Sequence, residues 1–166
     1  MINSPGDNNE VFMVNHCAFW IPLPAVRSKS NYRHMDKGNA WRKLQGFENE
    51  VALSARVALP PEWVLGDKSD SVSQRPSVLC CIAARSMLDA GNLSKSVLDA
   101  VQGVIYHSDA SVRAVTEIVE RTSTDQCGAA GFVLLKAGTP EDEVLDALTA
   151  LPRALLTAWR RLQNLG

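Results

Sequence analysis

Two acidic side chains, Asp89 and Asp109, stand twenty positions apart on either side of a segment patterned as a helix, and Lys95 lies on that segment. A helix of about ten residues advances ~15 Å. The five or six extended residues up to Ser108 can return ~18 Å in the opposite direction. The chain therefore permits the two carboxylates to meet beside a lysine, and most of a functional interpretation depends on whether they do.

Each of these residues also has an ordinary structural interpretation. Asp89 would cap the helix that Asn92 opens. Lys95 and Asp99 would form a solvated pair four residues apart, worth about 0.3–0.5 kcal/mol. Asp109 would be a turn residue before a strand. Both interpretations remain open on these residues alone.

The elements around these residues have clear patterns. Residues 77–85 are apolar on both faces, which predicts a central strand. The following helix, 88–103, should point Leu93, Val97, Ala100 and Val101 inward and end at Gly103. Residues 112–121 alternate as a strand, with Val112, Ala114, Thr116 and Ile118 on one face.

The remaining elements complete an alternating order. Residues 1–9 read as a disordered lead, 10–23 as the first strand and 25–39 as an exposed loop. A helix should begin at Asn39 or Ala40, with an inner stripe that includes Trp41 and either Leu53 or Ser54, and end before Pro60. A loop at 66–75, a turn at 122–130 and a strand at 131–137 follow along the chain.

The residue pattern of the C-terminal segment predicts a helix with Thr139 as its N-cap and Pro140 as its first residue. Pro152 should kink or split it. Its apolar stripe favours an interface between subunits over a core, and consists of Leu145, Leu148, Leu151, Leu155, Trp159 and Leu162.

Together the elements predict an α+β fold: a two-layer sandwich in which helices pack on a mixed sheet of about four strands. Residues 1–138 would form the main domain and residues 139–166 a C-terminal helical extension.

Composition excludes several classes. The 166 residues are 46% hydrophobic and 21% charged, as in an ordinary globular protein, and no run is long enough to span a bilayer. The first ten residues have no signal-peptide pattern, so we expect a cytoplasmic protein. Four cysteines lack zinc-ligand spacing, and the adjacent Cys80 and Cys81 should be buried and reduced.

Charge is uneven although the net charge is only −1. Six basic residues and a single acid lie between positions 27 and 43, near Tyr32 and Trp41. Such a cluster would suit contact with a DNA backbone. The basic residues are Arg27, Lys29, Arg33, Lys37, Arg42 and Lys43.

Three separated blocks resemble the RusA family of Holliday junction resolvases. The first is Asp89-Ala-Gly-Asn-Leu-Ser-Lys95, the second Leu98-Asp-Ala-Val-Gln-Gly103, and the third Ser108-Asp-Ala-Ser-Val112. Upstream, Ile21-Pro-Leu-Pro24 and Ser30-Asn-Tyr-Arg-His34 are similar to the family's strand end and polar loop. The likeness covers about residues 11–137.

This resemblance implies a homodimer, typical of phage, that binds four-way DNA junctions in recombination and repair and nicks them with Mg²⁺ or Mn²⁺. Mg²⁺ takes hard oxygen ligands and offsets the charge that develops during phosphodiester hydrolysis. Carried over by position, Asp89 and Asp109 would hold the metal, and Lys95 would face the phosphate. The basic residues listed above, with Asn31 and Asn92, would contact DNA.

The sequence departs from the family pattern at two acids, where Gly91 and Ser108 stand instead. Glu117 or Asp99 could substitute, although neither spacing argues for it. Three hypotheses follow. The chain is a junction-cleaving endonuclease, or it is a RusA-like fold without cleavage that binds DNA or protein. The third is a structural partner protein whose acidic, then apolar C-terminal helix docks elsewhere.

Overall fold

The computed structural model describes residues 16–25, 37–65, 76–86, 93–123 and 127–164. The predicted lead at 1–9, the loop at 66–75 and most of the basic loop lie outside these residues. Within them the predicted order of strands and helices is confirmed.

A four-stranded mixed sheet forms the centre of the molecule, in the order β1-β4-β2-β3. The strands are β1 (His16–Leu23), β2 (Ser77–Ser86), β3 (Val112–Arg121) and β4 (Gly128–Leu135). β4 runs antiparallel to both of its neighbours, and β2 and β3 are parallel. The two inner strands, β2 and β4, are almost entirely buried, which confirms the central position expected of 77–85.

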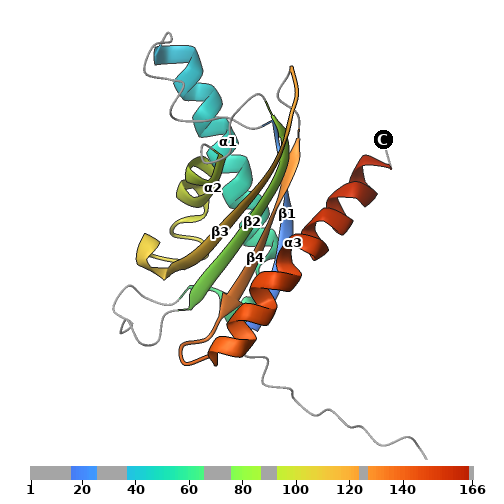
Figure 1. Ribbon diagram of the computed structural model, residues 1–166. Coiled ribbons are helices and arrows are strands. Elements are labelled where there is room, and N and C mark those ends of the chain that lie inside the picture. The colour runs from blue at the N-terminus through green and yellow to red at the C-terminus, as the bar shows by residue number, and fades with distance from the viewer. Residues whose placement is uncertain (1–15, 26–36, 66–75, 87–92, 124–126, 165–166) are drawn as a thin grey trace, which may run out of the picture.

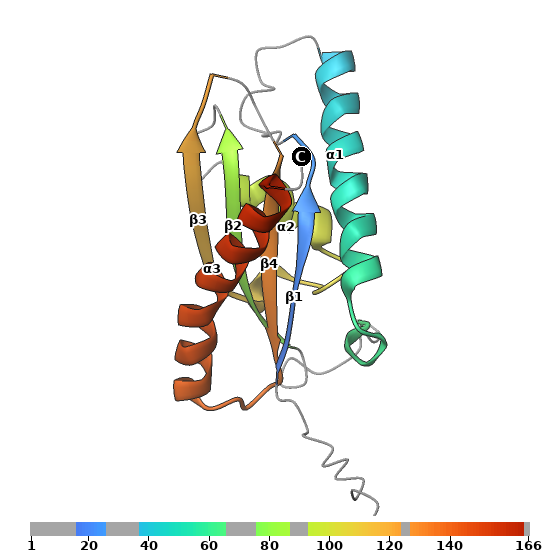
Figure 2. The same ribbon diagram turned by 90° about the vertical axis from the view of Figure 1, so that its right-hand side faces the viewer.

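Helices cover both faces of this sheet. The helices α1 (Lys37–Ala58) and α2 (Leu93–Val101) pack on one face, and α3 (Glu141–Gln163) crosses the other (Figures 1 and 2). The α+β class and the mixed four-stranded sheet are therefore confirmed. The predicted two layers describe α1, α2 and the sheet, and the C-terminal extension adds a third layer.

The buried apolar stripe of α1 contains fewer residues than the sequence predicted. Leu44, Phe47, Val51 and Ala55 are buried, but Trp41 is 54% exposed, so its predicted inward position is wrong. Of the two alternatives Leu53 and Ser54, Leu53 is 61% exposed and Ser54 is half-buried. The helix also begins at Lys37, two or three residues before the predicted start at Asn39 or Ala40. It ends at Ala58, before Pro60 as predicted.

A shift in strand register explains the imperfect alternation of β3. Val78 pairs with Val112 but Leu79 pairs with Ala114, so an extra residue is accommodated at the start of the strand. Val112 consequently packs with the α1/α2 face, whereas Ala114 and Ile118 pack with the α3 face. The prediction that all three share a face is wrong for Val112.

Gly128 belongs to β4 and not to the predicted turn. A Cβ at this position would lie 2.5 Å from the carbonyl oxygen of Ala83, in the neighbouring strand β2. Glycine is needed here because the two backbones approach closely.

α3 packs its apolar stripe against the sheet. Leu151, Leu155 and Trp159 join the core cluster of this face, so the predicted subunit interface along this stripe is wrong for them. The helix continues through Pro152 as a single element, not split. The helix begins at Glu141, so Pro140 is not its first residue as predicted. The Thr139 hydroxyl donates back to the carbonyl of Lys136 at 2.7 Å, in the preceding turn.

No helix in the described residues is both long and apolar enough to cross a membrane.

Candidate active site

The structure describes some of the predicted site residues and not others. Asp89, Gly91 and Asn92 lie outside the described residues, so the predicted meeting of Asp89 with Asp109 is not tested. Lys95 lies on α2 with its side chain exposed. Asp109 is the first residue of the 3-10 turn η4 (Asp109–Ser111), directly before β3, and is also exposed.

α2 connects the parallel strands β2 and β3, and its inward residues are the predicted ones. Leu93, Val97, Ala100 and Val101 are all buried against the sheet. After the helix, Gly103 adopts a φ of 82° and its N–H donates to the carbonyl of Tyr106 at 2.7 Å. A glycine is suited to this left-handed conformation. It turns the chain back toward η4, as the sequence predicted.

The first turn of α2 is held by an acid from the sheet. A carboxylate oxygen of Glu117, on β3, accepts a hydrogen bond from the backbone N–H of Ser94 at 2.8 Å. The first N–H groups of a helix lack partners within the helix, and a negative charge there also suits its dipole. Glu117 therefore positions α2 and has one carboxylate oxygen engaged in doing so, although the sequence had marked it only as a substitute metal ligand.

The second anchor of α2 is Tyr106, which the sequence did not single out. Its ring is buried and its hydroxyl donates to the carbonyl of Leu98 at 2.8 Å. Burial is the largest cause that raises the pKa of Tyr106; the charge of Asp109 also raises it, as do Cys80 and Asp99. The phenol stays protonated, and its single hydrogen is donated to the Leu98 carbonyl.

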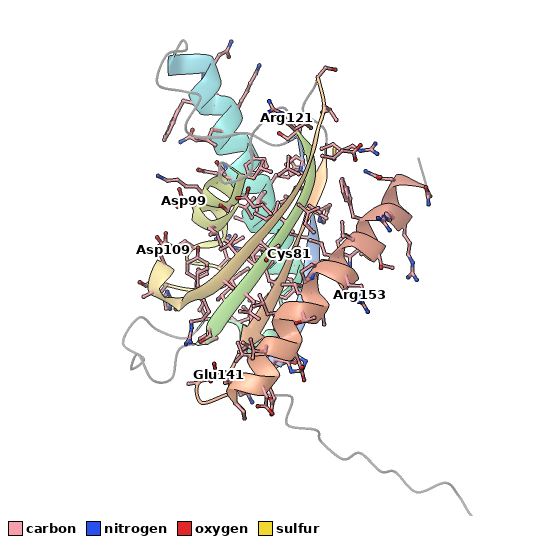
Figure 3. The ribbon with its side chains drawn as sticks, in the orientation of Figure 1. Cys81, Asp99, Asp109, Arg121, Glu141 and Arg153 are labelled. Atoms are coloured by element: carbon pink, nitrogen blue, oxygen red, sulfur yellow. The ribbon has the colours of Figure 1, made fainter. Side chains whose placement is uncertain are left out.

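Tyr106 thus connects Asp109 to the C-terminal half of α2. Asp99 acts on the same hydroxyl through its charge, and Figure 3 shows Asp99 and Asp109 on neighbouring elements of the same side. Among described residues, Asp99 is therefore the acid that shares surroundings with Asp109. The sequence had named Asp99 only as a possible substitute ligand, because its spacing gave no argument for that role.

In the described part of the chain no three His, Cys, Asp or Glu side chains come together as possible metal ligands. Mg²⁺ can be held by one or two carboxylates together with water and substrate phosphate. Asp109 and Asp99 are the described carboxylates of this region, and Asp89 lies outside the described residues.

Two of the predicted DNA contacts, Arg42 and Lys43, are described on α1, on the same face of the sheet as α2 but toward its other end. Arg42 and Lys43 are exposed near the start of α1, whose first residue is Lys37. This end of α1 lies toward the finish of β2 and β3, near Arg121, whereas Asp109 lies where β3 begins (Figures 1 and 3). The other predicted DNA contacts, Arg27, Lys29, Asn31 and Arg33, fall outside the described residues.

The cysteines offer no alternative site. Cys17, Cys80 and Cys81 are free and buried, and Cys127 is free and exposed, as expected of reduced thiols. Burial raises the pKa of Cys81 to about 11. Burial also raises the pKa of Cys80, with smaller effects from Cys81 and Glu117. Both thiols therefore stay protonated and are poor metal ligands or nucleophiles.

Comparison with known proteins adds no assignment. A scan against models of protein families gave no match, and a search of curated proteins gave no significant match.

Proposed function

We propose that this protein is a RusA-like, Mg²⁺-dependent endonuclease that acts in the cytoplasm as a homodimer on four-way DNA junctions during recombination and repair. The spacing of the three sequence blocks is the origin of this proposal. The observation that carries it further is the position of Asp109, which is exposed and whose charge acts on Tyr106, the side chain bonded to the helix that bears Lys95.

Each side chain would have a defined task. Asp109 and Asp89 would hold Mg²⁺ or Mn²⁺, which supplies charge neutralisation and a hydroxide nucleophile when bound. The exposed ammonium group of Lys95 would bind the phosphate. Tyr106 anchors α2 through the Leu98 carbonyl and feels the charge of Asp109, and Glu117 fixes the helix under Lys95.

DNA binding would rest on the basic start of α1. Arg42 and Lys43 are exposed there, and Lys37 begins the helix. The residues named in the sequence for this role, Arg27, Lys29, Asn31, Arg33 and Asn92, would extend the same surface. Contacts of this kind act through phosphate charge, so binding should weaken steeply with salt.

A RusA-like fold that binds DNA or protein without cleavage is the second candidate. It is favoured by a specific observation: the described residues bring no three metal ligands together. Glu117 has one oxygen committed to α2, and Gly91 and Ser108 stand where the family has acids.

One assay separates the two. A labelled four-way junction is incubated with the protein and Mg²⁺ or Mn²⁺, beside Asp89→Asn and Asp109→Asn. The matched control is Asp142→Asn, an exposed acid on the opposite face. Symmetric nicking that both site variants abolish and the control retains supports the nuclease.

Binding in a gel shift without nicking, together with cleavage gained by Gly91→Asp, supports the binding module instead. A protein that neither shifts nor cuts the junction contradicts both candidates.

A further inference from the structure

The outer face of α3 is a shallow groove that no other described element covers. Its wall is made by α3 residues alone and runs from Asp146 to Arg161, a length of ~22 Å at 1.5 Å per residue. The inner face of the same helix is filled by Leu151, Leu155 and Trp159. The two faces are therefore distinct, and only the outer one is available to a partner.

The floor of the groove is made of small side chains with few free polar groups. Ala150 and Ala154 line it. The hydroxyls of Thr149 and Thr157 donate to the carbonyls of Leu145 and Arg153, four residues back, at 2.9 Å each. These two threonines consequently need no further partner and can present their methyl groups.

The charges on α3 are separated along its length. The N-terminal half carries four acids and no base, and the C-terminal half three arginines and no acid. Within the described residues none of them has an ion-pair partner. They are Glu141, Asp142, Glu143, Asp146, Arg153, Arg160 and Arg161.

We propose that this groove binds the same groove of a second copy of the chain, with the two α3 helices antiparallel and the twofold axis between Arg153 and Ala154. This arrangement places Asp146 opposite Arg161 of the partner subunit at both ends. The small residues between them then face one another, Thr149 toward the partner's Ala158 and Ala150 toward the partner's Thr157. A twofold interface of this kind needs a surface that is complementary to itself, and the charges at the two ends of the groove, Asp146 and Arg161, meet that need.

Other occupants fit less well. A parallel pair would bring acids against acids and arginines against arginines, which is unfavourable. DNA would be repelled by the four acids. A second copy in antiparallel orientation satisfies both ends at once, and small side chains let two helices approach to about 8 Å between axes.

The inference does not depend on the nuclease. It gives the proposed homodimer a contact surface, on the opposite face of the sheet from Asp109, and its test uses no DNA. Failure of junction cleavage would therefore leave it intact, and failure of the dimer would leave the proposed chemistry intact.

Sedimentation equilibrium of the full chain tests it by exchange of charge. Asp146→Arg and Arg161→Asp should each raise the dimer Kd about tenfold or more, because each replaces two attractive pairs by two repulsive ones. The double variant should restore the wild-type Kd. An equimolar mixture of the two single variants should form a heterodimer, since each then supplies the charges the other lacks.

Two further variants locate the axis. Ala154→Trp is expected to abolish association by filling the groove at its centre, with unchanged circular dichroism because Ala154 is exposed. Arg153→Ala should tighten the dimer, since Arg153 and its symmetry copy lie close together at the axis. Arg160→Asp is the matched control: it makes the same charge change beside Arg161 but outside the groove, and should have a much smaller effect.

A wild-type protein that is monomeric at all concentrations overturns the proposal. It is also overturned if the double variant stays as weak as the single ones, or if Arg160→Asp weakens the dimer as much as Arg161→Asp.

Discussion

The two faces of the sheet hold their helices by different means. On the α1/α2 face, polar side chains reach the backbone of α2, from Glu117 to Ser94 and from Tyr106 to Leu98. On the α3 face the contacts are apolar: within the described residues no hydrogen bond or ion pair joins a side chain of α3 to the sheet. Directional bonds define where a helix lies to within tenths of an ångström, whereas apolar burial is non-directional and sets mainly how much free energy is gained.

This difference predicts a division of effects. Substitutions on the α3 face should lower the free energy of unfolding strongly and leave the surroundings of Asp109 unchanged. Substitutions of the polar anchors of α2 should cost less stability and disturb the candidate site more.

The largest effect is expected for Leu155→Ala. Leu155 is 2% exposed in the core cluster of the α3 face. Truncation of a buried leucine costs about 2–5 kcal/mol, depending on how well the cavity collapses. Urea denaturation at neutral pH measures the loss. A decrease below about 1 kcal/mol would mean that α3 contributes little to the fold and would contradict the comparison.

Gly131→Val should be the next most destabilising change. A Cβ at Gly131 would lie 2.9 Å from Cδ1 of Leu151, so α3 must shift to admit a side chain. Overpacking of this kind costs about 1–3 kcal/mol.

The control for Gly131→Val is Gly46→Ala, in the middle of α1, where a Cβ would meet no atom within 4 Å. This variant should gain about 0.5–1 kcal/mol, since alanine favours a helix over glycine. Urea midpoints of the two variants should therefore move in opposite directions. Movement of both midpoints in the same direction would show that contact with α3 does not determine which side chains are tolerated at position 131.

Gly128 and Trp41 show how far the sequence could predict the fold. Periodicity located every described strand and helix, because apolar residues recur at spacings typical of each. It failed where a neighbour decides. Glycine is typical of a turn, but Gly128 lies in β4. A glycine is needed there because the carbonyl of Ala83 leaves no room for a Cβ. Trp41 fits the stripe of α1 but remains 54% exposed.

Glu117→Ala tests the polar anchor at the start of α2. Loss of a capping interaction costs about 0.5–2 kcal/mol. The matched control is Glu120→Ala on the same strand. Its carboxylate pairs with Arg85 at 2.8 Å on the surface, where such a pair contributes about 0–1 kcal/mol.

The expected result is a larger loss of urea stability for Glu117→Ala than for Glu120→Ala, together with weaker junction binding only in the former. Equal effects of the two variants would show that the Ser94 hydrogen bond does not position α2.

The candidate site was less predictable than the fold for a physical reason. Asp109 and Lys95 were found from a local pattern, but Glu117 lies 23 residues from Ser94 and Tyr106 is eight residues from Leu98. A hydrogen bond between distant residues leaves no periodic signal in the chain. The one available hint was an aromatic residue with a hydroxyl three positions before Asp109.

The smallest effect on stability at neutral pH, about 1 kcal/mol, is expected for Tyr106→Phe, which removes the hydroxyl bonded to the Leu98 carbonyl. The variant is distinguished by how its free energy of unfolding changes with pH. The folded chain raises the pKa of Tyr106 above the ordinary 10.0, so the unfolded chain releases the phenolic proton first. Stability that is fully present below pH 10.0 is then lost as the pH rises toward the folded pKa. Cys81, whose pKa is raised from 9.0 to about 11, adds a loss that begins near pH 9.0 in wild type and variant alike.

Urea unfolding at a series of pH values above neutral should therefore show a shallower alkaline decline for Tyr106→Phe than for wild type. The chain has two tyrosines, so the difference in phenolate absorbance between wild type and this variant reports Tyr106 alone. Because the charge of Asp109 helps to raise the pKa of Tyr106, Asp109→Asn should lower the pH at which that absorbance appears. An unchanged titration in Asp109→Asn would mean that the two side chains do not interact, and the link between the candidate site and α2 would be lost with it.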